Sequence, residues 1–362
     1  YSHQVYDAMQ GCLSCKACVS QCPVQIDIPA LKSQFLHSYH SRYLRSLRDY
    51  LTASIETISY WQAQFPSLAN TITKNRILQE GINQILGIVD LPEISGNSLK
   101  KELSKKKVPK FTLERLSNLT ELERKNSVIL IQDAFTSFYE PNLVIDTYNF
   151  LSELGYNVYI APFFINGKPL HMKGFLGQFK EIAQKNISYL QQLAPLDIPL
   201  VGIEPSIVLT YRNEYVKIAG GKGISDRVKL IQEFLLEQGE FLPQIPTKNV
   251  YYLLGHCNEK SLSVKSQKQW QEVFKKMGIS LNLISTGCCG MAGIYGHESE
   301  HYQYSQEIYQ SSWQKHLPTN PEDRQYFLVT GYSCRSQVKR FSGWLPSHPI
   351  QGLLANLELL SQ

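Results

Sequence analysis

Four cysteines near the start of the sequence have a spacing that suits one kind of chemistry above others. Residues 12–23 read CLSCKACVSQCP, which is the pattern C-x2-C-x2-C-x3-C-P. Three thiolates separated by two residues each wrap a tight loop around one face of an iron–sulfur cube, and backbone N–H groups of the loop point at its sulfides. A zinc site or loose thiols are the alternatives. We therefore predict a [4Fe–4S] cluster, with ligands from Cys12, Cys15, Cys18 and Cys22.

The fourth cysteine of the run has a second interpretation. In two-cluster ferredoxins, the last cysteine of such a run ligates the other cluster. The motif of that second cluster is not in this sequence, and Cys12 comes eleven residues after Tyr1. We therefore expect a piece of a longer protein, in which Cys12, Cys15 and Cys18 share one cube and Cys22 serves another. In this chain alone the first cluster is then absent or damaged, unless Cys22 bends back to complete it.

A second group of cysteines lies far along the chain, each at the end of a predicted strand. Cys257, the pair Cys288–Cys289 and Cys334 make up this group. Parallel neighbouring strands have their carboxyl ends at one edge of a sheet, so the four thiolates are expected to meet there. Such a set suits a soft metal, either an iron–sulfur cluster or zinc, and Gly287 and Gly290 permit the sharp turn that adjacent ligands need. Buried, inert cysteines are the alternative.

Other polar residues near these cysteines are weaker candidates. His256 and His297 lie close to the second group in sequence, but a lone histidine is more often structural than a ligand. Lys168, His171 and Lys173 follow a predicted strand and are candidates for binding an anion or a carboxylate; an ordinary basic surface loop is the alternative. The sequence contains no recognisable flavin or nicotinamide motif.

Helices are predicted before residue 126. Residues 41–98 carry apolar side chains every three or four positions, which is typical of amphipathic helices. Residues 100–110 contain six lysines and a proline. This stretch predicts a solvated linker, with a docking patch for an acidic partner or a membrane surface as the alternative.

Short apolar strands alternate with helices from residue 126 onward, which predicts parallel sheets with helices on their faces. Helical patterns include 226–238 and 264–277. The predicted strands are 127–133, 157–163, 198–204, 250–257, 281–287 and 326–332.

The strand region is predicted to contain the same α/β unit twice. The intervals between the cysteine positions of the second half resemble those between Asp133, Phe163–Phe164 and Ile207 in the first half. We expect these residues to occupy the equivalent positions in a copy that has lost its cysteines and binds no metal. The predicted domains are a cluster segment at 1–40, a helical region with its lysine-rich linker at 41–110, a cysteine-less unit at 126–245 and a cysteine-bearing unit at 246–362.

Composition restricts the class of protein further. The 362 residues are 43% hydrophobic and 19% charged, and the net charge of +5 is too weak to indicate nucleic-acid binding. No apolar run approaches the roughly 18 residues of a membrane span, and no signal peptide is visible. We expect a cytoplasmic protein, with peripheral membrane contact left open.

The motifs together resemble those of a known family. Residues 12–23, 255–257, 287–293 and 331–340 are similar to the C-terminal iron–sulfur and CCG region of the large FAD-linked D-2-hydroxyacid dehydrogenases of the YdiJ type. More distantly, the two repeats resemble the CCG domains of heterodisulfide reductase and of the glycolate oxidase iron–sulfur protein. The resemblance implies an N-terminal helical, ferredoxin-like iron–sulfur segment followed by two CCG-type α/β units with parallel sheets.

The resemblance also implies a function. In such enzymes an FAD domain oxidises a D-2-hydroxyacid, here D-2-hydroxyglutarate or D-lactate, and electrons leave through the iron–sulfur module to an acceptor. This chain is then that module, inactive alone, with an upstream FAD domain and a second ferredoxin-type cluster as partners. A full CCG motif ends in C-x-x-C, whereas Gln337 stands three residues after Cys334, which implies a four-thiolate site. The competing hypotheses are a heterodisulfide- or thiol-reducing protein and a docking domain stapled by zinc.

Overall fold

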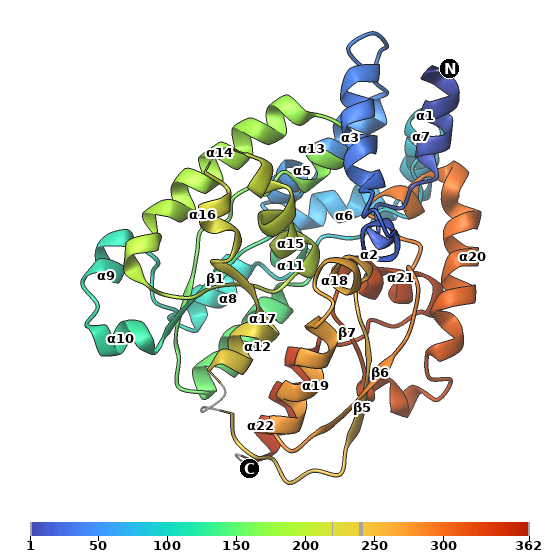
Figure 1. Ribbon diagram of the computed structural model, residues 1–362. Coiled ribbons are helices and arrows are strands. Elements are labelled where there is room, and N and C mark those ends of the chain that lie inside the picture. The colour runs from blue at the N-terminus through green and yellow to red at the C-terminus, as the bar shows by residue number, and fades with distance from the viewer. Residues whose placement is uncertain (1, 219, 239–241, 361–362) are drawn as a thin grey trace.

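The computed structural model describes residues 2–218, 220–238 and 242–360, and its first third is helical (Figure 1). Side-chain caps begin several of these helices, as where Asp27 accepts a hydrogen bond from the Ala30 amide at 3.0 Å. The helices are α1 (Ser2–Gln10), α2 (Ala17–Gln21), α3 (Ile28–Tyr39), α4 (Leu47–Ala53), α5 (Ile55–Gln62), α6 (Pro66–Lys74), α7 (Arg76–Leu86), α8 (Leu99–Lys105), α9 (Leu113–Ser117) and α10 (Glu121–Lys125).

A first parallel sheet follows, with the strand order β2-β1-β3-β4 in the described residues. Every residue of β1 is buried, because helices cover both faces of the sheet and leave no side for water. Its strands are β1 (Ser127–Ile131), β2 (Asn157–Ile160), β3 (Leu200–Gly202) and β4 (Val228–Leu230). Its helices are α11 (Ala134–Phe138), α12 (Pro141–Glu153), α13 (Lys168–Met172), α14 (Leu176–Gln192), α15 (Pro205–Asn213), α16 (Lys222–Ser225) and α17 (Ile231–Glu237).

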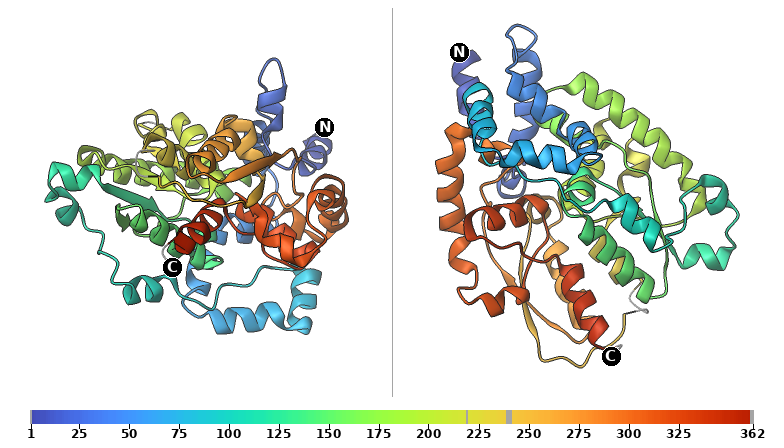
Figure 2. Two further views of the ribbon diagram at one scale, coloured as in Figure 1. Left: turned by 90° about the horizontal axis from the view of Figure 1, so that it is seen from below. Right: turned by 180° about the vertical axis from the view of Figure 1, so that it is seen from behind.

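A second parallel sheet has the order β6-β5-β7 in the part of the chain that is described. Its strands are β5 (Val250–Leu254), β6 (Ser280–Ile284) and β7 (Phe327–Val329). The accompanying helices are α18 (Cys257–Leu262), α19 (Ser266–Lys276), α20 (Tyr302–Ser312), α21 (Tyr332–Ser342) and α22 (Pro349–Leu360). The two units pack against each other (Figure 2), since α12 contacts α22 and α17 contacts α19. One apolar core runs through both units.

All six predicted strands are present, but each ends two or three residues earlier than predicted. The residues after the strands are still apolar, as at Ala161 and Ile203, yet they belong to loops that lead into helices. The prediction of a helix over 226–238 was wrong at its start, because Val228–Leu230 forms strand β4 beside β3. Helix α17 begins only at Ile231.

The repeat is visible in the strand bounds of the two sheets. β1 and β5 begin 123 residues apart, as do β2 and β6, while β3 and β7 begin 127 apart. With these offsets Cys334 corresponds to Ile207, as predicted. The other two equivalences were wrong, because Cys257 corresponds to Ala134, and the pair Cys288–Cys289 corresponds to residues 165–166. Gly167 and Gly290 confirm the corrected alignment, with φ values of +84° and +85°.

Asp133 and Phe163, which we predicted at the positions equivalent to cysteines, have other roles. Asp133 caps α11 by accepting hydrogen bonds from the amides of Phe135 and Thr136 at 2.8 and 2.9 Å. Phe163 stacks on Tyr60 of α5, with ring centroids 5.8 Å apart. These side chains therefore hold helices in place rather than fill a vacated metal site.

Across the described residues, no helix combines the length and the apolar character that crossing a membrane requires.

Candidate metal centre

The four cysteines of the second unit lie on three segments that follow its strands. Cys257 is the first residue of α18, Cys288 and Cys289 lie in the loop after β6, and Cys334 lies in the first turn of α21. Cys289 and Cys334 are buried, with 2% and 1% of their surface exposed. The parallel order of the strands brings these segments to one edge of the sheet, as the sequence predicted.

The four side chains form a row of contacts. Cys288 is hydrogen-bonded with Cys257 and with Cys289, and Cys289 with Cys334. The hydrogen bond from Cys257, supported by Cys289 and by the Gly290 amide at 3.4 Å, holds the pKa of Cys288 well below its usual value despite burial. The same bonds, together with burial, raise the pKa values of Cys257 and Cys289 well above theirs.

Backbone geometry gives the Cys288–Cys289 loop its turn. A Cβ at Gly290 would lie 2.4 Å from the Ser305 carbonyl oxygen, and the residue has a positive φ, so only glycine fits. Ser305 Oγ donates to the Gly290 carbonyl at 2.8 Å, and Lys260 of α18 donates to the Thr286 carbonyl. The loop is therefore fixed by the helices on either side of it.

Gln337 stands where a longer motif would have a fifth cysteine. Its side chain is fully buried and its amide donates to the Cys289 carbonyl at 3.0 Å and to Ser305 Oγ at 2.8 Å. The residue therefore orients the cysteine loop through hydrogen bonds, and four thiolates remain as the donor set.

The first cysteine loop is docked on the helix that Cys257 begins. Ser261 Oγ of α18 donates to the Cys15 carbonyl at 3.1 Å. Asn258, with its amide turned to face the loop, donates to the carbonyls of Cys15 and Ser14 at 3.1 Å each. The Cys15 thiol also interacts electrostatically with Cys257 and Cys288, so the two cysteine groups are neighbours.

Two lysines, one of them buried, tie the same loop to the rest of the chain. Lys16, which is 4% exposed and has a φ of +62°, forms ion pairs with Asp27 at 2.8 Å and with Glu214 at 3.1 Å. Lys32 of α3 donates to the Cys12 carbonyl at 3.2 Å. Lys16, Lys32 and Glu214 were not predicted from the sequence, although the position of Lys16 between two cysteines was a signal.

Within the first group, Cys22 has surroundings different from those of the others. Cys15 interacts with Cys12 and Cys18, and its burial raises the pKa of its thiol. The side chain of Cys22 instead accepts hydrogen bonds from the amides of residues 24–26, first that of Ile26, which lower the pKa of its thiol. The assignment of Cys22 to a different cube stays a prediction.

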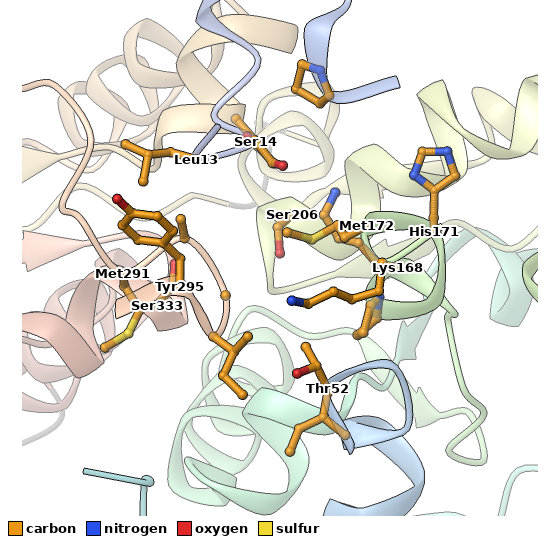
Figure 3. Close-up of a pocket in the computed structure, with 18 of the residues that line it drawn as sticks. Leu13, Ser14, Thr52, Lys168, His171, Met172, Ser206, Met291, Tyr295 and Ser333 are labelled. Carbon is orange, nitrogen blue, oxygen red and sulfur yellow. The ribbon is translucent and has the colours of Figure 1, made fainter. Parts of the chain in front are cut away.

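Both cysteine groups line one cavity of ≈ 200 Å³ between the N-terminal helices and the two units. Cys12, Cys257, Cys288 and Cys289 are among the residues that line it. Figure 3 shows apolar side chains on opposite sides of it, Met291 on the left and Met172 on the right. The cavity provides room beside the thiols for a group larger than a single ion.

The basic loop after β2 reaches this cavity. Lys168, His171 and Lys173 all line it. Lys173 is paired with Asp49 at 3.1 Å and with Glu298 at 3.2 Å. Burial lowers the pKa of His171 to about 4, so its ring is neutral.

The two histidines near the second cysteine group have structural contacts. His256 Nε2 lies 3.3 Å from Ser333 Oγ, and His297 Nδ1 lies 3.0 Å from the Val89 carbonyl oxygen. Burial lowers the pKa of each to about 4. Both are neutral side chains in the wall of the cavity.

The spacing of the sulfurs bears on the kind of metal. Two thiolates on one zinc ion are at most about 4.6 Å apart, twice the Zn–S bond. Among the described residues, the one set of three or more potential ligand atoms within 4.8 Å of one another is Glu298, Glu300 and His301, and it includes no cysteine. A donor set of four thiolates suits zinc or an iron–sulfur centre.

Comparisons with known proteins agree with the predicted resemblance. The chain is 43% identical to the D-2-hydroxyglutarate dehydrogenase of Pantoea ananatis over 357 residues, which is 98% of this chain and 34% of that protein. It is 39% identical to the Escherichia coli D-2-hydroxyglutarate dehydrogenase over 98% of this chain and 35% of that protein. The chain thus spans about a third of the length of these relatives.

A more distant relative has a different name. The chain is 23% identical to one of the subunits of the anaerobic glycerol-3-phosphate dehydrogenase of Escherichia coli over 275 residues, which is 73% of this chain and 66% of that protein. No family model matches the sequence. No solved structure matches it either.

Proposed function

We propose that this chain is the electron-transfer module of an FAD-linked D-2-hydroxyacid dehydrogenase, in which it holds two iron–sulfur centres. The observation that carries the proposal is the docking of one cysteine loop on the helix that begins with a cysteine of the other group. The Cys15 carbonyl accepts a hydrogen bond from Ser261, on the same helix as Cys257. Two iron–sulfur centres held in this way lie close together, as electron transfer between them requires.

The relatives support an electron-transfer role over substrate chemistry. By their names, the close relatives act on D-2-hydroxyglutarate and the distant one on glycerol 3-phosphate. A segment that both groups of relatives contain is expected to serve a step that their two reactions share. Both reactions oxidise an alcohol, and both must then pass electrons to an acceptor. We propose that the substrate is D-2-hydroxyglutarate, with D-lactate as the alternative, and that FAD and substrate bind outside this chain.

The chain's own residues would act by holding and shielding the centres. An iron–sulfur centre, when bound, takes up and releases single electrons. Cys12, Cys15 and Cys18 would hold one centre, while Cys22 would reach toward another. The second group, Cys257, Cys288, Cys289 and Cys334, would hold the other centre of this chain. Lys260 and Gln337 fix the loop that presents two of these thiols, and the apolar wall of the cavity restricts water.

Helices α4 to α7 support the proposal of a flavin-bearing partner polypeptide. They expose large apolar side chains, including Leu47, Trp61, Leu68, Ile77 and Ile85, between 63% and 81% accessible. Helix α7 has no buried residue. A surface of this kind is typical of an interaction site. We propose that the FAD-bearing polypeptide docks here.

Elemental and spectroscopic analysis of anaerobically purified protein tests the function. We expect iron and inorganic sulfide, a broad visible absorption that dithionite bleaches, and less iron in Cys289→Ser than in the parent. The chain alone should not oxidise D-2-hydroxyglutarate. Colourless protein with one zinc would contradict the proposal and favour a stapled docking domain, and turnover without added flavoprotein would contradict the module assignment.

A second candidate function rests on the cavity. Because Cys257, Cys288 and Cys289 line it, a small disulfide or thiol substrate would have direct access to the second centre, as in a heterodisulfide-reducing protein. Reduction of a small disulfide by the dithionite-reduced protein, abolished in Cys288→Ser, would favour this function. Absence of such turnover leaves electron transfer as the function that fits.

A further inference from the structure

Lys168 comes from the cysteine-less unit but extends into the cavity beside the cysteines of the other unit. It is the first residue of α13 and follows Gly167, so its equivalent in the second unit is Met291. Figure 3 shows its amino group directed into the open centre of the cavity, away from its own helix. The first unit thus contributes a cationic group to the wall of a site whose thiols all belong to the second.

The amino group of Lys168 has few partners in the described part of the chain. Its one hydrogen bond there goes to the hydroxyl of Thr210 at 3.1 Å, and no carboxylate oxygen lies within 4.0 Å of it. An ammonium group has three N–H donors, so donors remain that face the cavity. Lys168 interacts electrostatically with Cys257, Glu214 and Glu204, and burial lowers the pKa of its ammonium.

Two other cations near the cysteines, Arg335 and Lys260, have bonding partners of their own. Arg335, next to Cys334, pairs with Glu140 at 2.5 Å and donates to the Val329 carbonyl at 3.1 Å. Lys260 donates to the carbonyl and hydroxyl oxygens of Thr286. Lys260 has no carboxylate partner within the described residues either, but it does not line the cavity, whereas Lys168 lines it and has its charge offset only at longer range, by Glu214 and Glu204.

A buried cation without a carboxylate partner is costly unless another anion offsets it. A metal centre held by four thiolates is such an anion, and its net charge is one of the factors that set its affinity and reduction potential. We propose that Lys168 is an electrostatic partner of the metal centre at Cys257, Cys288, Cys289 and Cys334, and that it strengthens metal binding and stabilises the reduced form. The effect on the reduced form rests on the proposed function, while the effect on metal affinity applies to any metal bound by these thiolates.

The matched variants are Lys168→Met, Lys168→Arg and Lys185→Met. Methionine is the residue that the second unit has at the equivalent position, and it retains the length of the side chain without the charge. Arginine retains the charge. Lys185 is exposed on α14 of the same unit, so Lys185→Met removes the same net charge away from the cavity.

Two readouts on anaerobically purified full chain test the proposal. EPR-monitored potentiometric titration gives the midpoint potential of the signal that Cys289→Ser abolishes, and chelator competition gives the metal affinity of the same site. We expect Lys168→Met to lower the ratio of reduced to oxidised centre about tenfold at a fixed potential, which is 59 mV for one electron. In the chelator competition its affinity for the metal should fall several-fold. Lys168→Arg and Lys185→Met should resemble the parent.

Each result decides the proposal. An unchanged potential and unchanged affinity in Lys168→Met would overturn it, as would equal losses in the methionine and arginine variants, which would indicate packing. If Lys168→Met does not fold by circular dichroism, Lys168→Gln replaces it, and failure of both neutral variants to fold would show a structural role and also overturn it. If the parent holds zinc, the proposed function fails while the affinity test still decides the role of Lys168.

Discussion

Lys16 offers a sharp test of how the first cysteine loop is held. The Lys16→Met substitution removes a buried cation and leaves Glu214, which is 4% exposed, with an unpaired charge. Methionine retains the Cβ, so the positive φ of Lys16 stays as strained as before, whereas glycine would relieve that strain and confound the result.

The magnitude follows from what remains around Glu214. Removing one partner of a buried ion pair lowers the free energy of unfolding by roughly 3–5 kcal/mol, because the other charge is left uncompensated. Burial raises the pKa of Glu214, but Lys168 and Lys16 together hold it below its usual value, so Lys168 still compensates part of the charge. Asp27 is 27% exposed and regains water. We therefore expect Lys16→Met to lower the free energy of unfolding by about 3 kcal/mol, the lower end of that range.

Urea unfolding followed by circular dichroism measures this loss, with iron content determined on the same samples. The double variant Lys16→Met/Glu214→Gln should recover part of the loss, because the uncompensated charge is gone. Glu214→Gln alone should cost less than Lys16→Met, since Lys16 keeps Asp27 as a partner. A Lys16→Met protein within about 1 kcal/mol of the parent, or a double variant no more stable than the single one, would refute the reasoning.

Two further predictions concern the turn at the metal centre and a buried carboxyl. Gly290→Ala should lower the free energy of unfolding by about 3 kcal/mol, because the residue has a positive φ and its Cβ would lie 2.4 Å from the Ser305 carbonyl oxygen. Gly343 also has a positive φ but faces open space, so Gly343→Ala should lower it by only about 1 kcal/mol in the same urea titration. Burial raises the pKa of Glu56 to about 7, so its charged form destabilises the fold as pH rises from about 4.5 to 7, by up to about 3 kcal/mol. Glu56→Gln should therefore gain stability relative to the parent between pH 5 and pH 8, and parallel pH profiles would contradict this.

Much of the fold could be predicted because apolar runs mark buried strands directly. The six strands were found, since residues such as those of β1 are apolar at nearly every position and alternate with amphipathic helices. Their ends could not be placed, because apolar residues continue into the loops that pack on the helices. Strand β4 was missed because its three residues run directly into α17.

The convergence of the four cysteines could also be predicted, since it follows from parallel strand order alone. The contacts between segments distant in sequence could not be. Nothing local in Lys16 indicates Glu214, and nothing in Ser261 indicates the Cys15 carbonyl, because both pairs depend on how the N-terminal loop settles on finished α/β units. The repeat was detectable from spacing, but its alignment required the strand bounds and the two glycines with matching φ.

The same backbone turn performs related tasks in the two units. At Gly290 the amide donates to the Cys288 sulfur at 3.4 Å, and at the equivalent Gly167 it donates to a Glu56 carboxylate oxygen at 2.8 Å. The other Glu56 oxygen accepts from the Asn166 amide at 3.0 Å. A turn with amides directed to one side attracts an acceptor, and the unit without cysteines receives one from helix α5 instead of from a thiolate. In the unit without cysteines, the turn thus binds Glu56 and anchors the N-terminal helices to the α/β core, next to the cavity they help to enclose.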